Sequence, residues 1–394
     1  KRRSAHSHMM DTQRILVITE LFLPTKGGTA VWFDEVYRRL GGKEIHIVTA
    51  AVPGGEAHDS SHPNTIHRLD LRRSPWLRPE SLAMYLKLLC KCLVLLATNR
   101  FDAVHAGRVL PEGLVGWCVA RLFGKPLVIY AHGEEITTWR QSGKFRAMRF
   151  AYRHADTVIA NSEFTRDELL KIGVNEQRIV LIHPGVDIAR FRPGLPCDDL
   201  RAQLGCGESG QLLLSVGRLS RRKGFDQVIR CVQRLLPAHP ELHYALVGIG
   251  EDQQYLQELA RECGVAHRVH LLGHVAAEDL PRWYNAADVF VMPNREIDGD
   301  TEGFGMVFIE ASACGTPVVA GDAGGTASAV NNGVNGYRVD GNSLVAITAT
   351  VHRLLAEPAL RERMSASAHD WATQGFSWGR VASATRAIAR QAGK

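Results

Sequence analysis

Short apolar runs rich in β-branched residues recur along the chain, and stretches with the apolar spacing of helices separate them. In the first half the runs are RILVITELF (14–22), IHIVTA (45–50), AVHA (103–106), PLVIY (126–130) and TVIAN (157–161). Strands that are apolar on both faces and alternate with helices are typical of a parallel sheet covered on both sides. Residues 10–190 are therefore predicted to form one α/β domain.

The segment HPGVDIARFRPG (183–194) breaks this periodicity with two prolines and two glycines, which indicates a linker. The pattern then restarts with LLLSVG (212–217), HYALVG (243–248), VHLLG (269–273), DVFVMP (288–293) and TPVVAG (316–321). Residues 191–375 are thus predicted to form a second α/β domain, followed by a helix from Trp378. Two doubly wound domains place the expected ligand cleft at the carboxyl ends of their strands.

The composition narrows the class of protein further. With 394 residues, 45% of them apolar and 22% charged, the chain is unlike a disordered, collagenous or coiled-coil protein. Three positive charges of the net +6 lie in KRRSAHSHM (1–9), which we interpret as an expression scar. Residues 191–394 carry more acidic than basic residues, and basic residues are not interleaved with aromatic ones, so nucleic-acid binding is disfavoured.

The cysteines and the longest apolar runs indicate the cellular compartment of the protein. Eight cysteines are scattered without a C-x-x-C pair or a Cys/His cluster at zinc spacing, which is typical of a reducing cytosol. No apolar run reaches the roughly 18 residues of a membrane span, since Lys87 and Lys91 interrupt the longest candidate, 82–97. We therefore expect a cytoplasmic protein that is either soluble or attached peripherally to the inner face of the cytoplasmic membrane.

Two carboxylates flank a glycine-containing loop in EGFGMVFIE (302–310). Gly303 and Gly305 allow the backbone to approach a ligand, and the helix predicted from Met306 has free N–H groups that favour an anion. Glu310 lies about one turn inside that helix, within reach of a ribose, whereas Glu302 precedes it and can face a sugar ring. The alternative is a capping acid followed by an ordinary helical glutamate.

Basic residues follow the first strand of the second half, in SVGRLSRRKGFD (215–226). Gly217 leaves the strand end open, Arg218 offers a planar fork of donors and Lys223 adds a point charge, which together suit a pyrophosphate. The alternative is a solvated basic loop, because Arg221 and Arg222 are also present.

Three weaker signals complete the set. Gly27-Gly28 after the first strand would let backbone N–H groups approach a phosphate or an acceptor. The alternative is that these glycines only form a tight turn. His132 follows another strand and could bond a hydroxyl or transfer a proton. Asp298-Gly299-Asp300 resembles a metal clamp, but no strand of the expected kind precedes it, and we predict no metal there.

Seven segments occur in an order and spacing that are specific as a set. They are GG (27–28), HGEE (132–135), NSEFTRDEL (161–169), PGVD (184–187), GRLSRRKG (217–224), VGIGED (247–252) and EGFGMVFIEA (302–311). On these segments the chain resembles the retaining glycosyltransferases of family 4, from about residue 15 to the C-terminus. The insert REIDGDTEGFG (295–305) is similar to that of bacterial mannosyl- and glucosyltransferases that build glycolipids and polysaccharides.

The resemblance implies a GT-B fold, in which two Rossmann-like domains face a central cleft and the last helix, 376–394, crosses back to the first domain. It also implies transfer of a hexose from GDP-mannose or a UDP-sugar to a lipid-linked or saccharide acceptor, with retention and without a metal or other cofactor. The implied catalytic residues are His132, Arg218, Lys223 and Glu302. The implied donor-binding residues are Gly28, Gly217, His274, Val275, Gly303, Phe304, Gly305, Met306, Val307 and Glu310.

Two other classes share this fold. A nucleotide-sugar epimerase would need an acid–base set that the sequence does not offer, and a nucleotide-sugar-binding protein without turnover would not need His132. The sugar, the nucleobase and the acceptor are not determined by the sequence.

A basic and apolar segment in the first half is the candidate acceptor or membrane surface. Its basic and aromatic members are Arg72, Arg73, Trp76, Arg78, Lys87 and Lys91. Leucines and Tyr85 form a stripe along 82–96, which is typical of an interfacial helix on anionic lipid or of a core helix whose lysines reach past its edge. We favour the core interpretation for the stripe, and a surface position for Arg72, Arg73, Trp76 and Arg78.

Overall fold

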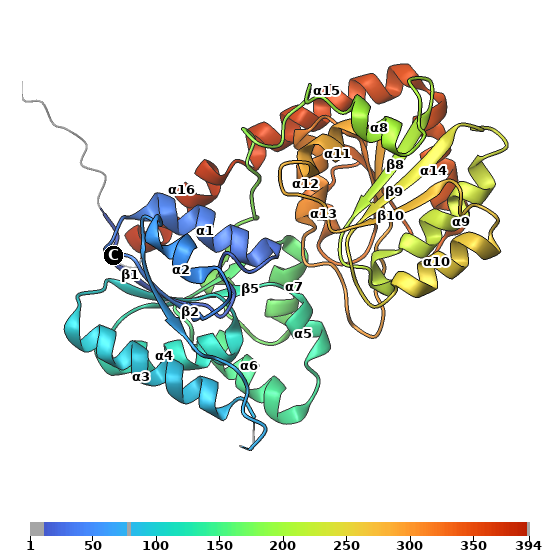
Figure 1. Ribbon diagram of the computed structural model, residues 1–394. Helices are drawn as coiled ribbons and strands as arrows, with labels where there is room; N and C mark the ends of the chain where they lie inside the picture. Colours follow the sequence, from blue (N-terminus) through green and yellow to red (C-terminus); the bar gives the residue numbers. More distant parts are fainter. Residues whose placement is uncertain (1–11, 77–79, 392–394) are drawn as a thin grey trace, which may run out of the picture.

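The computed structural model describes residues 12–76 and 80–391 and contains two α/β domains (Figure 1). The predicted scar at 1–9 and Arg78 lie outside these ranges. The first domain has a seven-stranded parallel sheet in the order β3-β2-β1-β4-β5-β6-β7. Its strands are β1 (Ile15–Ile18), β2 (His46–Ala50), β3 (Thr65–Leu69), β4 (Ala103–Ala106), β5 (Leu127–Ala131), β6 (Thr157–Ala160) and β7 (Ile179–Leu181).

The second domain repeats this arrangement with the parallel order β10-β9-β8-β11-β12-β13. Its strands are β8 (Gln211–Val216), β9 (Leu242–Val247), β10 (Val269–Gly273), β11 (Val289–Met292), β12 (Val318–Gly321) and β13 (Gly336–Val339). In each sheet the order reverses beside the first strand, and such switch points are where doubly wound folds bind ligands. The predicted fold class is confirmed.

All ten predicted strand segments contain or overlap a strand, whereas β3, β7 and β13 were not predicted. The three missed strands lie at the edges of their sheets and are mostly half-buried. An edge strand has a neighbour on one side only, so it is shorter and less uniformly apolar than a central strand. The predictive signal is correspondingly weak there.

Helices cover both sheets. Those of the first domain are α1 (Gly28–Leu40), α2 (Gly55–Ser60), α3 (Leu82–Thr98), α4 (Leu114–Phe123), α5 (Glu134–Thr138), α6 (Ser142–His154) and α7 (Glu163–Lys171). Those of the second are α8 (Asp198–Gln203), α9 (Phe225–Leu235), α10 (Gln253–Glu262), α11 (Leu280–Ala286), α12 (Met306–Ala313), α13 (Thr326–Ala329), α14 (Leu344–Ala356) and α15 (Pro358–Gly375). Short helical turns are η1 (Val109–Gly113), η2 (Glu176–Arg178) and η3 (Arg221–Lys223).

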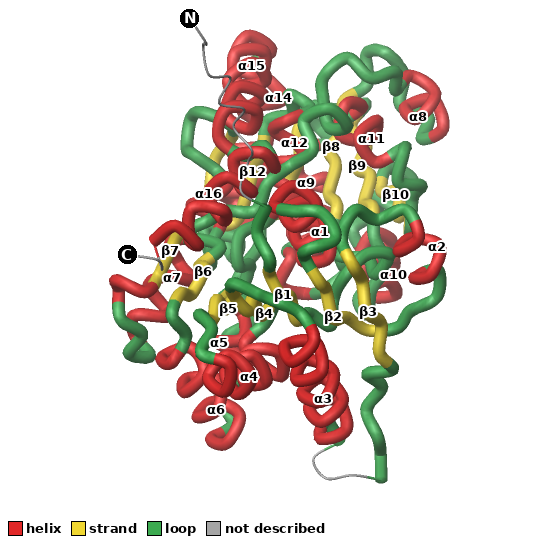
Figure 2. The backbone as a smooth tube through the Cα atoms, turned by 90° about the vertical axis from the view of Figure 1, so that its left-hand side faces the viewer, coloured by secondary structure: helices red, strands yellow, loops and turns green. Residues whose placement is uncertain are grey.

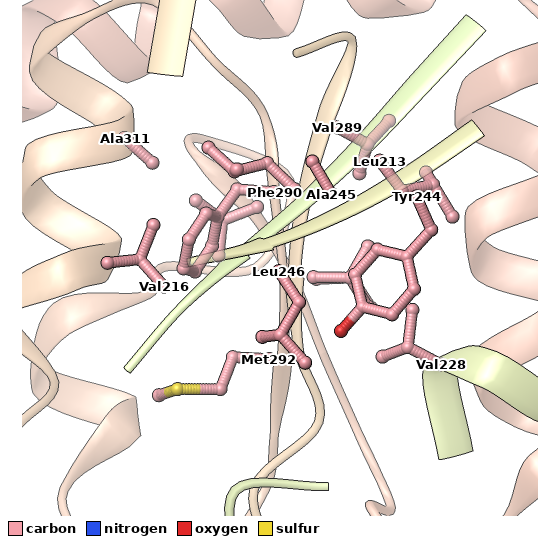
Figure 3. Packing of buried hydrophobic residues seen from close by; sticks show 14 of the residues in the cluster. Leu213, Val216, Val228, Tyr244, Ala245, Leu246, Val289, Phe290, Met292 and Ala311 are labelled. Carbon is pink, nitrogen blue, oxygen red and sulfur yellow. The ribbon is translucent and has the colours of Figure 1, made fainter. Parts of the chain in front are cut away.

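The alternating residues of β1 show how the first sheet is covered. Leu16 and Ile18 pack into a core with α3, α4 and α6, whereas Ile15 and Val17 pack with α1 and with α16 (Trp378–Gln391) on the other face. The last helix therefore belongs to the core of the first domain, and it lies beside α1 in Figure 1. The second domain has its own core, in which side chains of the neighbouring strands β8, β9 and β11 gather with Val228 of α9 and Ala311 of α12 (Figure 3).

Helix α3 is a core helix, but its buried face differs from the predicted stripe. Leu88 and Cys92 are fully buried, whereas the predicted stripe members Leu82 and Leu86 are 38% and 50% exposed. Almost every position of this helix is apolar, so spacing alone did not fix which face meets the sheet. Helix α3 lies at the lower edge of the first domain in Figure 2.

The chain crosses between the domains twice, and the two crossings lie side by side. The Val186 N–H donates to the carbonyl of Phe376 at 2.8 Å. A Cβ at Gly185 would lie 2.9 Å from the same carbonyl oxygen. The two domains are therefore joined by two chain crossings that are hydrogen-bonded to each other.

Candidate functional site

A cavity of about 300 Å³ lies between the domains, at the carboxyl ends of both sets of strands. The first domain and the linker line it with Gly28, Thr29, Trp32, His132, Glu134, Asn161 and Pro184. The second domain lines it with Lys223, Glu302, Gly303, Phe304, Gly305, Met306, Val307 and Glu310. Gly28, His132, Lys223 and the segment 302–310, which are far apart in the sequence and were predicted to bind ligand, thus share one cavity. The lining residues that were not predicted are Thr29, Trp32, Glu134, Asn161 and Pro184.

Two helix N-termini open onto this cavity, one from each domain. Helix α1 begins at Gly28 after Gly27 (φ 135°), and α12 begins at Met306 after Gly305 (φ 92°); neither has a side-chain cap. A Cβ at Gly28 would lie 2.6 Å from the sulfur of Met306, so the glycine permits this close approach. Uncapped N–H groups and the positive end of the helix dipole favour an anion such as a phosphate.

Glu302 is held by two cations. Its Oε2 lies 2.6 Å from the Lys223 ammonium and 3.1 Å from the Arg222 guanidinium, and all three side chains are 14% exposed. Burial by itself would raise the pKa of Glu302, but the charges of Lys223 and Arg222 outweigh it and lower that pKa to about 2. The site therefore presents an ionised, fixed carboxylate to whatever enters the cavity.

His132 is fixed by the first domain. Its Nε2 lies 2.7 Å from the carbonyl of Gly107, and because a carbonyl only accepts, Nε2 carries a proton and donates this hydrogen bond. The Glu135 carboxylate accepts from the His132 backbone N–H at 3.0 Å, and the Asn161 amide donates to the His132 carbonyl at 3.0 Å. The imidazole is thus oriented for a hydrogen bond with a hydroxyl group.

Glu310 projects from the second turn of α12 and is half-buried. Burial raises the pKa of Glu310 to about 7, although the Tyr284 hydroxyl, which donates to it at 3.1 Å, partly opposes the shift. Because Glu310 lies behind the N-terminus of α12, a ligand with its diphosphate at that terminus would extend its ribose toward this carboxylate.

Four predicted residues do not line the cavity. Arg218 is mostly exposed and its Nε lies 3.2 Å from Glu251, while Gly217 lies under Gly248, whose Cβ would overlap the Gly217 carbonyl. His274 is exposed and its Nε2 lies 2.9 Å from the ammonium of Lys26, across the domain boundary. Val275 packs against the core of the second domain. The catalytic role of Arg218 and the donor-binding roles of Gly217, His274 and Val275 stay predictions.

Arg222 is the main site residue that the sequence did not single out. The alternative of a solvated basic loop treated Arg221 and Arg222 alike, yet Arg221 is 47% exposed and pairs with Asp252, whereas Arg222 is 14% exposed. The two residues belong to the 3₁₀ turn η3, in which neighbours differ in direction by about 120°. Asp300, in the segment where no metal was predicted, forms an ion pair with Arg222, whose Nε lies 3.0 Å from its carboxylate.

One group of side chains could hold a metal ion by proximity, within the described residues. Asp34, His58 and His62 place one ligand atom each within 4.8 Å of one another. However, His62 Nδ1 accepts from the Asn64 N–H at 3.1 Å, so its Nε2 bears the proton that points to Asp34 at 2.7 Å. Arg38 also occupies the Asp34 carboxylate. The protonation that these hydrogen bonds require leaves no lone pair on His62 for a metal.

The basic and apolar segment is mostly on the surface. Trp76 is 93% exposed, and Arg72 and Arg73 are exposed, which agrees with the predicted surface position. Lys87 is exposed and donates to the Asp70 carbonyl at 2.7 Å, and Lys91 is half-buried. Within the part of the chain that the structure describes, no helix has the length and apolar character to cross a membrane.

Two Rossmann-like domains that face each other across a cavity, with an uncapped helix N-terminus on each side, have the arrangement of a GT-B fold. Residues 26–190 match the family described as Glycosyltransferase Family 4, and residues 198–371 match Glycosyl transferases group 1. The chain belongs to glycosyltransferase family 4.

Similar proteins agree with this assignment. The GDP-mannose-dependent alpha-(1-6)-phosphatidylinositol monomannoside mannosyltransferase of Mycolicibacterium smegmatis is 32% identical over 92% of this chain and 95% of its own. The D-inositol 3-phosphate glycosyltransferase of Thermobifida fusca is 36% identical over 71% of this chain and 67% of its own. The crystal structure of Anabaena HepE in complex with UDP has a TM-score of 0.80 at 22% identity, over 97% of this chain and 100% of that one.

Proposed function

We propose that this protein transfers a hexose, with retention and without a metal cofactor, from a nucleoside-diphosphate sugar to an acceptor that carries a phosphate. One observation supports the binding of a sugar-nucleotide donor. Two uncapped helix N-termini, Lys223 and Glu302 meet in one cavity. The diphosphate binds the N-terminus of α12 and Lys223, the ribose binds Glu310, and the hexose contacts Glu302. GDP-mannose and UDP-glucose are the first donors to test, because the relatives and the structural neighbours are named with them.

Lys223 and the N-terminus of α12 supply positive charge where the leaving nucleoside diphosphate develops negative charge. That is the role a divalent cation would otherwise fill, which supports transfer without a metal. Excess EDTA should therefore leave the rate of transfer unchanged, and a rate restored only by added Mg²⁺ or Mn²⁺ would contradict this part of the proposal.

We infer retention from the resemblance to the retaining enzymes of family 4, and the contacts of Glu302 and Glu310 bear on its route. Glu302 is engaged by Lys223 and Arg222, and Glu310 by Tyr284, so neither is placed as a free nucleophile of the kind used by retaining glycosidases. We therefore favour a front-side route. The bond from C1 to the phosphate oxygen breaks, the bond from C1 to the acceptor oxygen forms on the same face, and the acceptor proton passes to the phosphate.

A groove of about 760 Å³ in the first domain, between α3 and α6, is the candidate binding site for the acceptor. Arg73, Arg108 and Lys144 supply its positive charge, while Tyr85 and Trp139 supply apolar surface. Arg108 is balanced by Glu20 and Glu112, whereas neither Arg73 nor Lys144 has an acidic partner among the described residues.

Lys144 lies among other positive charges in this groove, which Glu20 and Glu80 also line. Burial, followed by the charges of Arg73 and Arg108, lowers the pKa of Lys144. Arg108 is the residue after Gly107, whose carbonyl holds His132, so one short segment contributes to the groove and supports a residue of the donor cavity. The two relatives are named for inositol-phosphate acceptors, one of them a phospholipid, and both chemistries fit a positive groove with apolar walls.

Lys144→Ala tests the acceptor assignment against Arg146→Ala, an exposed residue of the same helix that does not line the groove. A hydrogen bond to a charged group contributes about 1.5–3 kcal/mol, so Lys144→Ala should raise the KM for inositol 3-phosphate about 10- to 150-fold. The KM for the sugar nucleotide should not change. Equal effects of the two substitutions, or an equal KM for inositol and inositol phosphate, would contradict a phosphate subsite.

The same surface supports peripheral attachment to an anionic membrane. Trp76, Leu82 and Leu86 are exposed near Arg72 and Arg73, a combination suited to the interface of anionic lipids. Co-sedimentation with vesicles containing phosphatidylglycerol at low salt should retain the wild type and lose the Trp76→Ser variant. Failure of the wild type to bind would contradict attachment while leaving the transferase activity in place.

A further inference from the structure

Arg222 lies behind the donor cavity and contacts three carboxylates. Its Nη1 is 3.1 Å from Glu302, its Nε is 3.0 Å from Asp300, and its Nη2 is 3.9 Å from Glu134 of the first domain. Its backbone carbonyl accepts from the Arg295 N–H at 2.8 Å. The guanidinium is thus fixed in position, and Arg222 is not among the residues that line the cavity.

Lys223 is placed differently, although it is the next residue. It lines the cavity and donates to the same Glu302 oxygen at 2.6 Å. A diphosphate at the N-terminus of α12 brings a stronger negative charge to this ammonium, and would draw Lys223 away from Glu302. Without a second cation, Glu302 would then be left as a buried, unpaired carboxylate, which is costly.

The loop that carries Glu302 is also seated against the first domain. A Cβ at Gly299 would lie 2.6 Å from the carbonyl oxygen of Thr137 in α5, and one at Gly303 would lie 2.1 Å from that of His132. Arg222 joins this loop, through Asp300 and Glu302, to Glu134 at the start of α5. The same guanidinium therefore contacts the sugar-facing loop and the domain that closes over it.

We propose that Arg222 is a positioning residue, which keeps the Glu302 carboxylate directed at the transferred hexose after the donor diphosphate has taken Lys223. The inference rests on the proposed function, since it needs a nucleoside-diphosphate sugar in this cavity. It assigns different tasks to adjacent cations: Lys223 binds the diphosphate, and Arg222 serves the carboxylate that binds the sugar. Arg222 acts through Glu302 and does not touch the substrate.

The test compares ligands with and without the sugar. Isothermal titration calorimetry is performed with GDP and GDP-mannose, and with UDP and UDP-glucose, on the wild type, Arg222→Gln and Arg221→Gln. Arg221→Gln is the matched control, because it removes the same group from the same turn, where it pairs with Asp252.

For the nucleotide that the wild type binds, Arg222→Gln should weaken the sugar nucleotide roughly tenfold or more and change the free diphosphate less than about twofold. Arg221→Gln should change neither. Arg222→Lys, which keeps the charge, should recover part of the loss, and it replaces Arg222→Gln in the comparison if that variant does not fold. Equal weakening of both ligands by Arg222→Gln, or no weakening, would overturn the inference. Absence of binding by the wild type would overturn the proposed function, and the inference with it.

Discussion

Replacing Gly303 by alanine tests whether the two domains close around the cavity in the arrangement described above. A Cβ at this position would lie 2.1 Å from the carbonyl oxygen of His132 and 3.0 Å from the amide nitrogen of Asn161. Both neighbours belong to the first domain, whereas Gly303 belongs to the second. Relieving the contact with a carbonyl requires the two backbones to separate by about 1 Å.

Overpacking of this kind costs about 1–3 kcal/mol in a folded protein. Here the clash exists only while the domains are closed, because opening the cleft separates the alanine from His132. The cost should therefore fall on closure over the donor and not on the folding of either domain. It corresponds to a decrease of about 5- to 150-fold in kcat/KM for the sugar nucleotide.

The assay combines initial rates of transfer with thermal unfolding. Gly303→Ala should keep a wild-type unfolding midpoint and lose kcat/KM, whereas the control Gly42→Ala should lose neither, because a Cβ at Gly42 meets no atom within 4 Å. Full activity of Gly303→Ala would refute the closed geometry. A lowered midpoint with unchanged activity per folded molecule would show that the cost falls on folding, and would refute the argument from closure.

Three further predictions concern protonation and charge. Burial raises the pKa of Glu310 to about 7, so its carboxylate becomes protonated as the pH falls, and the neutral carboxyl group accepts a weaker hydrogen bond from the ribose than the ionised one. Calorimetry should show weaker nucleotide binding from about pH 8 to 6, and Glu310→Gln should remove that dependence. Burial lowers the pKa of His67 and of His243 to about 4, so the unfolded imidazoles take up protons first, below about pH 6.5. The free energy of unfolding should fall between about pH 6.5 and 4, and the double variant His67→Gln/His243→Gln should show a shallower fall in denaturant titrations. Lys26 and His274 are in contact across the domain boundary, but both are exposed. Because such a contact contributes about 0–1 kcal/mol, Lys26→Ala should raise the KM for the donor less than about fivefold. A larger increase would show that Lys26 contacts the donor.

The central strands and the motif at 302–310 were predictable because their signals are local. A strand buried on both faces must be apolar throughout, so its sequence is distinctive. The glycines and glutamates of EGFGMVFIE lie on one loop and one helix, and their spacing alone places Glu310 a turn behind the N-terminus of α12. The same reasoning failed for α3, because an almost uniformly apolar helix gives no indication of which face will be buried.

The amino-acid sequence by itself determined the two parallel sheets, the family and the loops that would supply ligand-binding groups. The tertiary structure alone decided which of those groups meet. Arg221 and Arg222 are chemically equivalent neighbours, and only the turn η3 and the carboxylates of Glu134, Asp300 and Glu302 direct one outward and the other inward. Local sequence encodes the conformation of each segment, but a charge interacts through space, so its role depends on partners supplied by other parts of the chain.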